Sequence, residues 1–132
     1  MAGAPEFLEP DVVLFMHAHT LKEYGGTHGL KSEDLLNSAL VGVEGRWHDA
    51  EGDRPDCAAL AAAYAYGIAR DHPFNGANKR TAWGCCVLFL RLNGFRVQVS
   101  APEAVETMVA LASGVLEECA FALWLRPYTH RH

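Results

Sequence analysis

The fold is decided by residues 56–92, which read DCAALAAAYAYGIARDHPFNGANKRTAWGCCVLFLRL. The six alanines between Ala58 and Ala65 favour helix strongly and let neighbouring helices approach closely. The stretch from Ala82 to Leu90 is apolar on nearly every side, as in a helix buried at the centre of a bundle. The sequence therefore predicts two central helices, residues 56–71 and 78–92, joined by a short loop.

Amphipathic segments precede this pair. Pro10 and Asp11 begin a helix that ends at Gly25-Gly26. Ser32 is a candidate N-cap for a second helix, and the polar stretch 44–55 after it reads as a loop. Both helices have a predicted apolar stripe, made of Val12, Val13, Phe15, Met16 and Leu21 in the first and Leu35, Leu36, Ala39, Leu40 and Val43 in the second.

Further helices follow the pair. Asn93-Gly94 ends the fourth helix, and residues 95–100 alternate as a short strand or extended link would. Ser100 and Glu103 have capping-box spacing and open a fifth helix that runs to about residue 113. A sixth spans about 117–125 and ends near Pro127. The predicted fold class is all-α, a single domain over residues 1–132 with frayed ends at 1–7 and 127–132.

Composition narrows the class of protein. A chain of 132 residues is one domain's worth. It has no apolar run of about 18 residues and no basic, apolar leader, so we expect neither a membrane span nor secretion, and a cytoplasmic location. The four cysteines lack metal or disulfide spacing and are expected to be reduced and mostly buried, at positions Cys57, Cys85, Cys86 and Cys119.

The charge distribution points to one region. A net charge of −5 argues against a general nucleic-acid binder. Between Gly67 and Val99, however, there are five basic residues and only one acidic residue. This segment is either a discrete anion site or a chance cluster of solvated side chains, and composition alone leaves both open.

The loop between the central helices combines groups that suit phosphate chemistry. Pro73 moves the preceding residue out of helical geometry, so the third helix ends near His72 and places its imidazole at the helix end. Phe74 can anchor the turn in the core. The small residues Gly76 and Ala77 precede a helix start with free N–H groups, beside which Lys79 and Arg80 add positive charge. A base, a small-residue loop and two cations are the composition of a phosphoryl or nucleotidyl transfer site, although each part alone is common in ordinary turns.

Two histidines in the first predicted helix give little evidence for a metal site. His17 and His19 are two positions apart, which puts them on different faces of a helix. They are therefore not predicted to bind a metal together.

The segment His72–Ala82, HPFNGANKRTA, resembles the signature loop of the Fic/Doc (Fido) superfamily. Fic proteins carry H-x-F-x-[D/E]-G-N-G-R-x-x-R there, and the Doc branch carries H-x-F-x-D-[A/G]-N-K-R-T-A. Lys79 and Thr81-Ala82 are similar to the Doc form. The resemblance extends over roughly residues 8–125.

The resemblance implies a six-helix Fido bundle whose central loop holds ATP. It implies a Doc-like toxin of a toxin–antitoxin module, a protein kinase that phosphorylates a Ser or Thr hydroxyl of a target such as elongation factor Tu and so inhibits translation. A Phd-type antitoxin would be the partner, its C-terminal segment filling a groove as a helix. Two alternatives stay open: a Fic-type adenylyltransferase, and a non-catalytic antitoxin-binding relative.

The resemblance also assigns roles to residues. His72 would be the general base and Phe74 the anchor of the motif, and Gly25, Gly26 and Thr27 would begin the flap on which the target lies. The residues that would bind the nucleotide phosphates are Arg70, Asn75, Gly76, Ala77, Asn78, Lys79 and Arg80.

One motif position departs from the family pattern. The acidic residue that binds Mg²⁺ in the family falls at Gly76, which supplies no carboxylate. No metal ligand is therefore assigned, and Mg²⁺ binding and activity are in question. An engineered inactivation, a weakly active natural variant and a binding-only relative would each explain this glycine.

Overall fold

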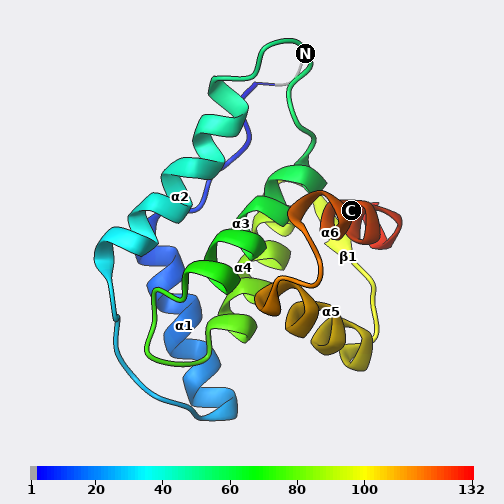
Figure 1. Ribbon diagram of the computed structural model, residues 1–132. Helices are drawn as coiled ribbons and strands as arrows, with labels where there is room; N and C mark the ends of the chain where they lie inside the picture. The colour runs from blue at the N-terminus through cyan, green and yellow to red at the C-terminus, as the bar shows by residue number, and fades with distance from the viewer. Residues whose placement is uncertain (1–2) are drawn as a thin grey trace.

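The computed structural model describes residues 3–132 and, over this range, has six α-helices and one two-stranded sheet (Figure 1). This confirms the predicted all-α class. The elements are α1 (Pro10–Tyr24), α2 (Glu33–His48), α3 (Cys57–Asp71), α4 (Asn78–Leu92), β1 (Phe95–Val97), α5 (Ala101–Ser113), α6 (Glu118–Leu125), the 3-10 helix η1 (Arg126–Tyr128) and β2 (Thr129–Arg131).

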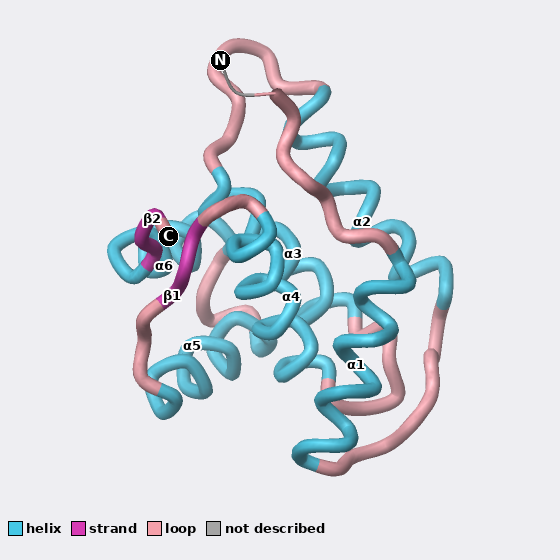
Figure 2. Tube along the Cα trace, turned by 180° about the vertical axis from the view of Figure 1, so that it is seen from behind, coloured by secondary structure: helices cyan, strands magenta, loops and turns pink. Residues whose placement is uncertain are grey.

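The predicted central pair is confirmed. Helices α3 and α4 lie in the middle of the bundle, with α1 and α2 on one side and α5 and α6 on the other (Figures 1 and 2). Alanines allow this packing: a Cβ atom on Gly67 of α3 would already lie 3.1 Å from the Cβ of Ala39 in α2. The side chains of α3 and α4 that are at most 1% exposed are Leu60, Ala61, Ala62, Ala63, Tyr64, Ala65, Ile68, Ala69, Thr81, Ala82, Cys85, Cys86, Phe89 and Leu90.

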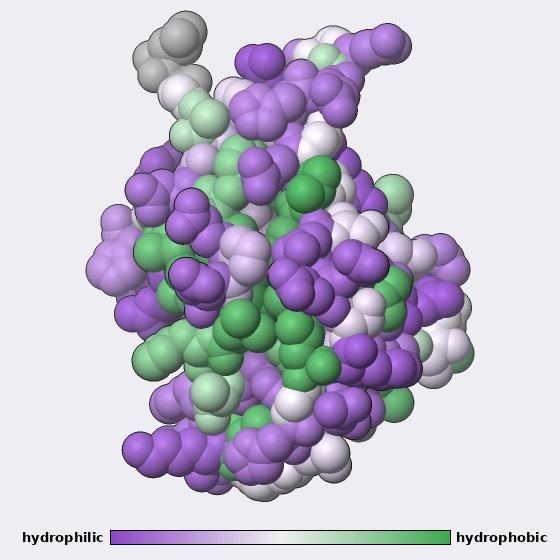
Figure 3. Space-filling model, turned by 90° about the vertical axis from the view of Figure 1, so that its left-hand side faces the viewer, coloured by the Kyte–Doolittle hydropathy of each residue, from purple (hydrophilic) through white to green (hydrophobic). Residues whose placement is uncertain are grey.

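The buried stripes of α1 and α2 differ from the prediction, since one predicted residue in each helix is exposed and α1 buries two polar residues that the prediction did not include. In α1 the buried residues are Val13, His17, Thr20 and Leu21, whereas Phe15 is 73% exposed. Val13, His17 and Thr20 are spaced by about one helical turn, so Phe15 falls outside their face. Leu35 at the start of α2 is likewise exposed. Figure 3, which looks at the side on which α1 and α2 lie, shows apolar side chains across the middle of that face.

Helix α2 extends beyond its predicted end. Ser32 caps its start by accepting a hydrogen bond from the Leu35 N–H at 3.1 Å, as predicted. The expected loop at residues 44–55 is wrong for its first part, because the helix continues to His48. Trp47 packs against the core and against Phe7, at 6.5 Å between ring centroids, which keeps the polar last turn helical. The polar composition did not mark a break here because Arg46 and His48 are exposed on the helix surface, where polar residues do not interrupt a helix.

The C-terminal segment 127–132 is paired rather than frayed. Strand β2 runs antiparallel to β1, with Phe95 opposite Arg131 and Val97 opposite Thr129 (Figure 2). The His132 N–H donates to the Gly94 carbonyl at 2.8 Å. The predicted extended segment near 95–100 thus has a partner that the sequence pattern did not show.

At the other end of the chain, residues 1 and 2 of the predicted frayed range lie outside the described residues. The Glu6 N–H donates to the Asn93 side chain at 2.7 Å, and Leu8 is buried. Within the described part of 1–7, the chain is therefore held against the end of α4.

The start of α5 follows half of the predicted capping box. The Ser100 hydroxyl accepts from the Glu103 N–H at 3.3 Å, as expected. The Glu103 carboxylate does not return to the cap, because it accepts hydrogen bonds from Trp124 Nε1 at 2.8 Å and from the Tyr128 hydroxyl at 2.7 Å. Glu103 thereby connects α5 to α6 and η1.

The cysteines are all free, as predicted. Cys85 and Cys86 are buried in the core, and burial raises the pKa of the Cys85 thiol to about 12. Cys57 is partly buried and Cys119 is exposed, so the expected burial is complete only at Cys85 and Cys86.

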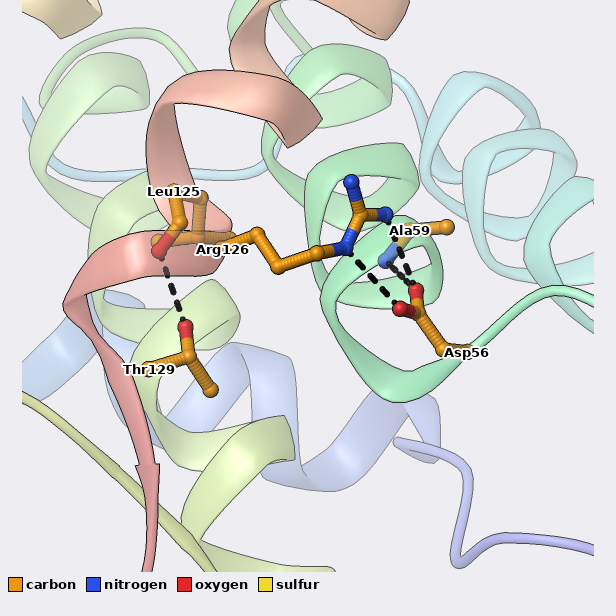
Figure 4. Close-up of polar contacts among 5 residues, drawn as sticks. All are labelled: Asp56, Ala59, Leu125, Arg126 and Thr129. Atoms are coloured by element: carbon orange, nitrogen blue, oxygen red, sulfur yellow. Dashed lines mark hydrogen bonds and ion pairs between the residues drawn. The ribbon is translucent and has the colours of Figure 1, made fainter.

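Asp56 joins the start of α3 to the end of α6 (Figure 4). Its carboxylate accepts from the Ala59 N–H at 2.9 Å and from Arg126 Nε and Nη2 at 3.0 and 3.2 Å. Partial burial raises the pKa of Asp56, but the hydrogen bonds from Arg126 and from the Ala59 N–H outweigh it and bring the pKa below its ordinary 3.8. The ionised form is therefore the one that stabilises the fold.

We expect Asp56→Ala to lower the free energy of unfolding at pH 7 by about 1 kcal/mol, mostly through loss of the helix cap. Asp56→Asn keeps a capping side chain and loses only an exposed ion pair, so its effect is smaller. Because the folded-state pKa is depressed, the carboxylate's contribution is lost as the pH falls through that value, and wild type and Asp56→Asn converge there. Urea unfolding at pH 7 and pH 3 measures both effects. If wild type and Asp56→Asn differ in free energy of unfolding by the same amount at the two pH values, the role of the charge is contradicted.

Candidate active site

His72 ends α3 and opens the central loop. It adopts a left-handed conformation, with φ 51° and ψ 58°, and its N–H closes the helix on the Ile68 carbonyl at 3.2 Å. The following Pro73 excludes helical geometry at this position, and histidine is among the residues that tolerate positive φ. The side chain is exposed, so the imidazole at this helix end is accessible to a reacting group.

The loop after His72 is closed by its own residues. Phe74 is 1% exposed and lies in the core. The Asn78 side chain accepts from the Phe74 N–H and donates to the Phe74 carbonyl, both at 3.0 Å. Because the amide oxygen and one of the two amide N–H groups are used in this way, the Asn78 side chain fixes the loop.

His17 of α1 lies beneath the loop. Its ring stacks on Phe74 with centroids 3.8 Å apart and planes 8° from parallel, and its Nε2 lies 2.9 Å from the Gly76 carbonyl oxygen. The side chain is 5% exposed. Sequence reasoning considered His17 only as half of a metal pair with His19 and missed this contact; the histidine on the buried stripe of an amphipathic helix was the available signal.

The flap, residues 25–32, is tied to the loop by backbone hydrogen bonds. Pro73 accepts from the N–H groups of Lys31 and Ser32 at 2.8 and 3.0 Å, and the Asn75 N–H donates to Gly29 at 3.0 Å. The Asn75 side chain donates to the His28 carbonyl at 3.1 Å, so it helps to hold the flap against the loop.

Glycine is required in this flap where it meets Asn75. At Gly29, φ is +107° and an added Cβ would lie 2.6 Å from Asn75 Nδ2. A side chain there would be strained and would displace Asn75. Gly26 is close to the loop as well, since a Cβ on it would lie 3.9 Å from the Cβ of Ala77.

The start of α4 presents open donors and positive charge. Ala77 has φ 61° and caps the helix without a side-chain hydrogen bond. Within the described range, the N–H groups of residues 77–80 have no hydrogen-bond acceptor. Lys79 and Arg80 are exposed, and the Arg80 guanidinium lies 4.8 Å from the ring centroid of Tyr24 at the end of α1. Open N–H groups at a helix start, with two cations beside them, form an arrangement suited to phosphate oxygens.

Arg70 is held away from this arrangement. Its guanidinium lies 5.5 Å from the Tyr66 ring centroid and against Gly114, where a Cβ would be 3.5 Å from Nη1. Gly114 caps the C-terminal end of α5, where the helix dipole favours a cation. The candidate site is therefore built without Arg70, although the sequence analysis included it.

Comparison with known proteins identifies the family. A family model described as Fic/DOC family matches residues 7–90. A relative named "Protein kinase doc", from Escherichia phage P1, is 32% identical over 119 residues, which cover 90% of this chain and 92% of the relative. The chain belongs to the Fic/Doc family. Within it, the match to Doc and the motif with Lys79 place it in the Doc branch.

The metal ligand implied by the Fic/Doc motif does not fit this chain. Gly76 has no carboxylate, and a Cβ placed on it would lie 3.1 Å from both the backbone nitrogen and the Cβ of Thr27. The flap therefore crowds the position that the Cβ atom of the family's acidic residue would take. Among residues 3–132, no three His, Cys, Asp or Glu side chains are grouped so that they could hold a metal ion. The residues present do not form a Mg²⁺ site.

A groove beside the Fic/Doc loop runs between α1, α4 and α5. It has a volume of about 780 Å³ and combines apolar side chains with the two cations of α4 at one end. Val105 and Val109 on α5 are 63% and 49% exposed along it. Its other lining residues are Met16, His19, Thr20, Glu23, Tyr24, Ala77, Asn78, Lys79, Arg80, Trp83, Gly84, Ala101, Ala104 and Met108.

No helix formed by residues 3–132 combines the length and apolar character needed to cross a bilayer.

Proposed function

We propose that this chain is a Doc-type toxin that transfers the γ-phosphoryl group of ATP to a Ser or Thr hydroxyl of a protein. One observation carries the proposal: a single hydrogen-bonded loop joins an exposed imidazole, His72, to the open N–H groups and the two cations at the start of α4. The relative named as a protein kinase supports the reaction type. The reaction would take place in the cytoplasm, where the proposed target is found.

His72 acts as the general base in this reaction. The imidazole takes the proton from the target hydroxyl as its oxygen forms a bond to the γ-phosphorus. The bond between that phosphorus and the bridging oxygen breaks, and ADP leaves with the bonding electron pair. A positioned base contributes about 10²–10⁴-fold to such a step.

The start of α4 stabilises the charge on the phosphate oxygens. The N–H groups of residues 77–80 donate hydrogen bonds, and Lys79 and Arg80 supply positive charge. Asn75, Asn78 and Phe74 hold this frame through the bonds described above. No metal-dependent step is assigned, because Gly76 supplies no ligand and Thr27 crowds the position where a side chain would begin.

The proposed target is elongation factor Tu, whose substrate segment would lie along Gly25, Gly26 and Thr27. The test is to incubate the chain with the factor and ATP labelled at either the γ- or the α-phosphate. Label from the γ-position alone supports phosphorylation. Label from the α-position would instead show adenylyl transfer; the absence of the second motif arginine, where Trp83 follows Thr81-Ala82, argues against that outcome.

Gly76 favours a second candidate, a non-catalytic relative that keeps only the antitoxin groove. The two candidates differ in one result. A binding-only relative transfers neither label, even after an acidic residue is placed at position 76, yet it still binds an antitoxin peptide.

The proposed antitoxin is of the Phd type, and the groove between α1, α4 and α5 is its proposed site. An amphipathic helix would place apolar residues on Val105 and Val109 and acidic residues near Lys79 and Arg80.

We expect Val109→Glu to weaken binding of the antitoxin's C-terminal peptide at least tenfold, because it puts a carboxylate in the apolar part of the groove. Titration calorimetry measures this. Val115→Glu is the control, since Val115 is 82% exposed and is not part of the groove lining. Equal weakening by both changes would place the peptide elsewhere.

A further inference from the structure

We infer that His17 is a positioning residue for the phosphate site: its Nε2–H holds the Gly76 carbonyl and thereby turns the Ala77 N–H outward. The expected effect on ATP binding rests on the proposed function. The position of His17 rests on its contacts with Phe74 and Gly76. His17 touches no reacting atom in the proposed reaction.

The hydrogen bond defines the state of the imidazole. A carbonyl oxygen only accepts, so the 2.9 Å contact with Gly76 requires the proton on Nε2 of His17. The ring is held flat against Phe74 at 3.8 Å, and the side chain is 5% exposed. Both the position of the donor and its direction are therefore set by the core.

The peptide between Gly76 and Ala77 transmits this position to the site. In a planar trans peptide, the C=O and N–H groups point in opposite directions. Because the Gly76 carbonyl points to His17 in the interior, the Ala77 N–H points away from α1. That N–H belongs to the set of open donors that precede and begin α4.

The location makes this bond important for the loop. Gly76 lacks a side chain that could restrict the peptide, and Ala77 adopts a left-handed conformation that only a few residue types favour. The two hydrogen bonds between the Asn78 side chain and the Phe74 backbone fix the loop at Phe74, two residues before Gly76. His17 supplies the restraint between these points.

Two substitutions separate the hydrogen bond from the stacking. His17→Phe keeps an aromatic ring against Phe74 and removes the donor. His17→Gln places an amide N–H near the former Nε2 and removes the ring. If His17 acts by holding the Gly76 carbonyl, Gln preserves the site and Phe does not.

The experiment measures ATP affinity by calorimetry and the order of the Ala77 and Asn78 amides by NMR relaxation. We expect His17→Phe to weaken ATP binding about tenfold and to lower the ¹⁵N order parameters of both amides. We expect His17→Gln to stay within about threefold of wild type in both measurements. In wild type, the ¹⁵N spectrum should show His17 as the Nε2–H tautomer.

A stability control separates positioning from general loosening. Val43 of α2 is fully buried and does not line the groove, so Val43→Ala lowers stability without touching the loop. If Val43→Ala weakens ATP binding as much as His17→Phe at an equal loss of melting temperature, the inference is wrong. It is also wrong if Gln fails to rescue or if the Nδ1–H tautomer is found.

The proposed function and this inference fail in different ways. If wild type binds no ATP, the proposed function fails. The NMR comparison of the Phe and Gln variants still decides whether His17 orders Ala77, since it needs no ligand.

Discussion

Replacing His72 with alanine is expected to reduce phosphate transfer to the target about 10²–10⁴-fold, the largest loss of any single change at the loop. The change removes the group that takes the hydroxyl proton and leaves the Lys79 and Arg80 cations in place. His72 has a positive φ that alanine tolerates less well, so the free energy of unfolding should fall by about 1 kcal/mol, which is not enough to unfold the protein. The measurement is the rate of γ-label transfer, with ATP affinity determined in parallel.

His130→Ala is the control for this variant. His130 is also exposed, but it lies in β2, at the other end of α4. The His130→Ala variant should transfer phosphate at the wild-type rate. If His72→Ala keeps that rate too, His72 is not the base, and another group must take the proton.

Gly76→Asp is expected to raise the transfer rate in the presence of Mg²⁺ about 10²–10³-fold. A carboxylate at this position supplies the ligand that the Fic/Doc motif normally provides, and several kcal/mol of charge stabilisation corresponds to such a factor. The new Cβ meets Thr27 at 3.1 Å, so the flap must shift by a few tenths of an ångström. Because the gain depends on Mg²⁺ bound by the new carboxylate, it should disappear when EDTA is added.

Two controls separate the carboxylate from crowding at the flap. Gly76→Asn has the same shape without the charge, and Gly76→Ala adds only the Cβ. Neither should increase the rate, and neither should respond to Mg²⁺. If Asp, Asn and Ala at position 76 behave alike, the missing acid is not what limits this chain, and the binding-only candidate is favoured.

Much of this bundle is visible in the sequence because local signals agree with the tertiary packing. The alanine run of α3 and the apolar stretch of α4 are buried as their composition requires, and Ser32 and Ser100 cap the helices that follow them, as predicted. Pro73 fixes where α3 ends. These features depend on neighbours within a few residues, which is what a sequence pattern records.

What the sequence did not reveal depends on contacts between distant segments. The stack of His17 on Phe74 joins residues 57 positions apart in number, and the pairing of β1 with β2 brings Phe95 to Arg131. Arg70 and Asn78 were expected to face phosphate, but the side chain of one packs on Gly114 and that of the other closes the loop. Residue type suggested charge and hydrogen-bonding capacity; only the packing showed where each was already used.

The pairing of β2 has a practical consequence for labelling the protein. Helix α4 starts at the Fic/Doc loop and ends beside β1, and His132 donates a hydrogen bond to Gly94 just after the helix. Fifteen helical residues span about 20 Å. A fluorophore or affinity handle fused after His132 therefore emerges at the opposite pole of the molecule from the loop, leaving nucleotide and target access unobstructed.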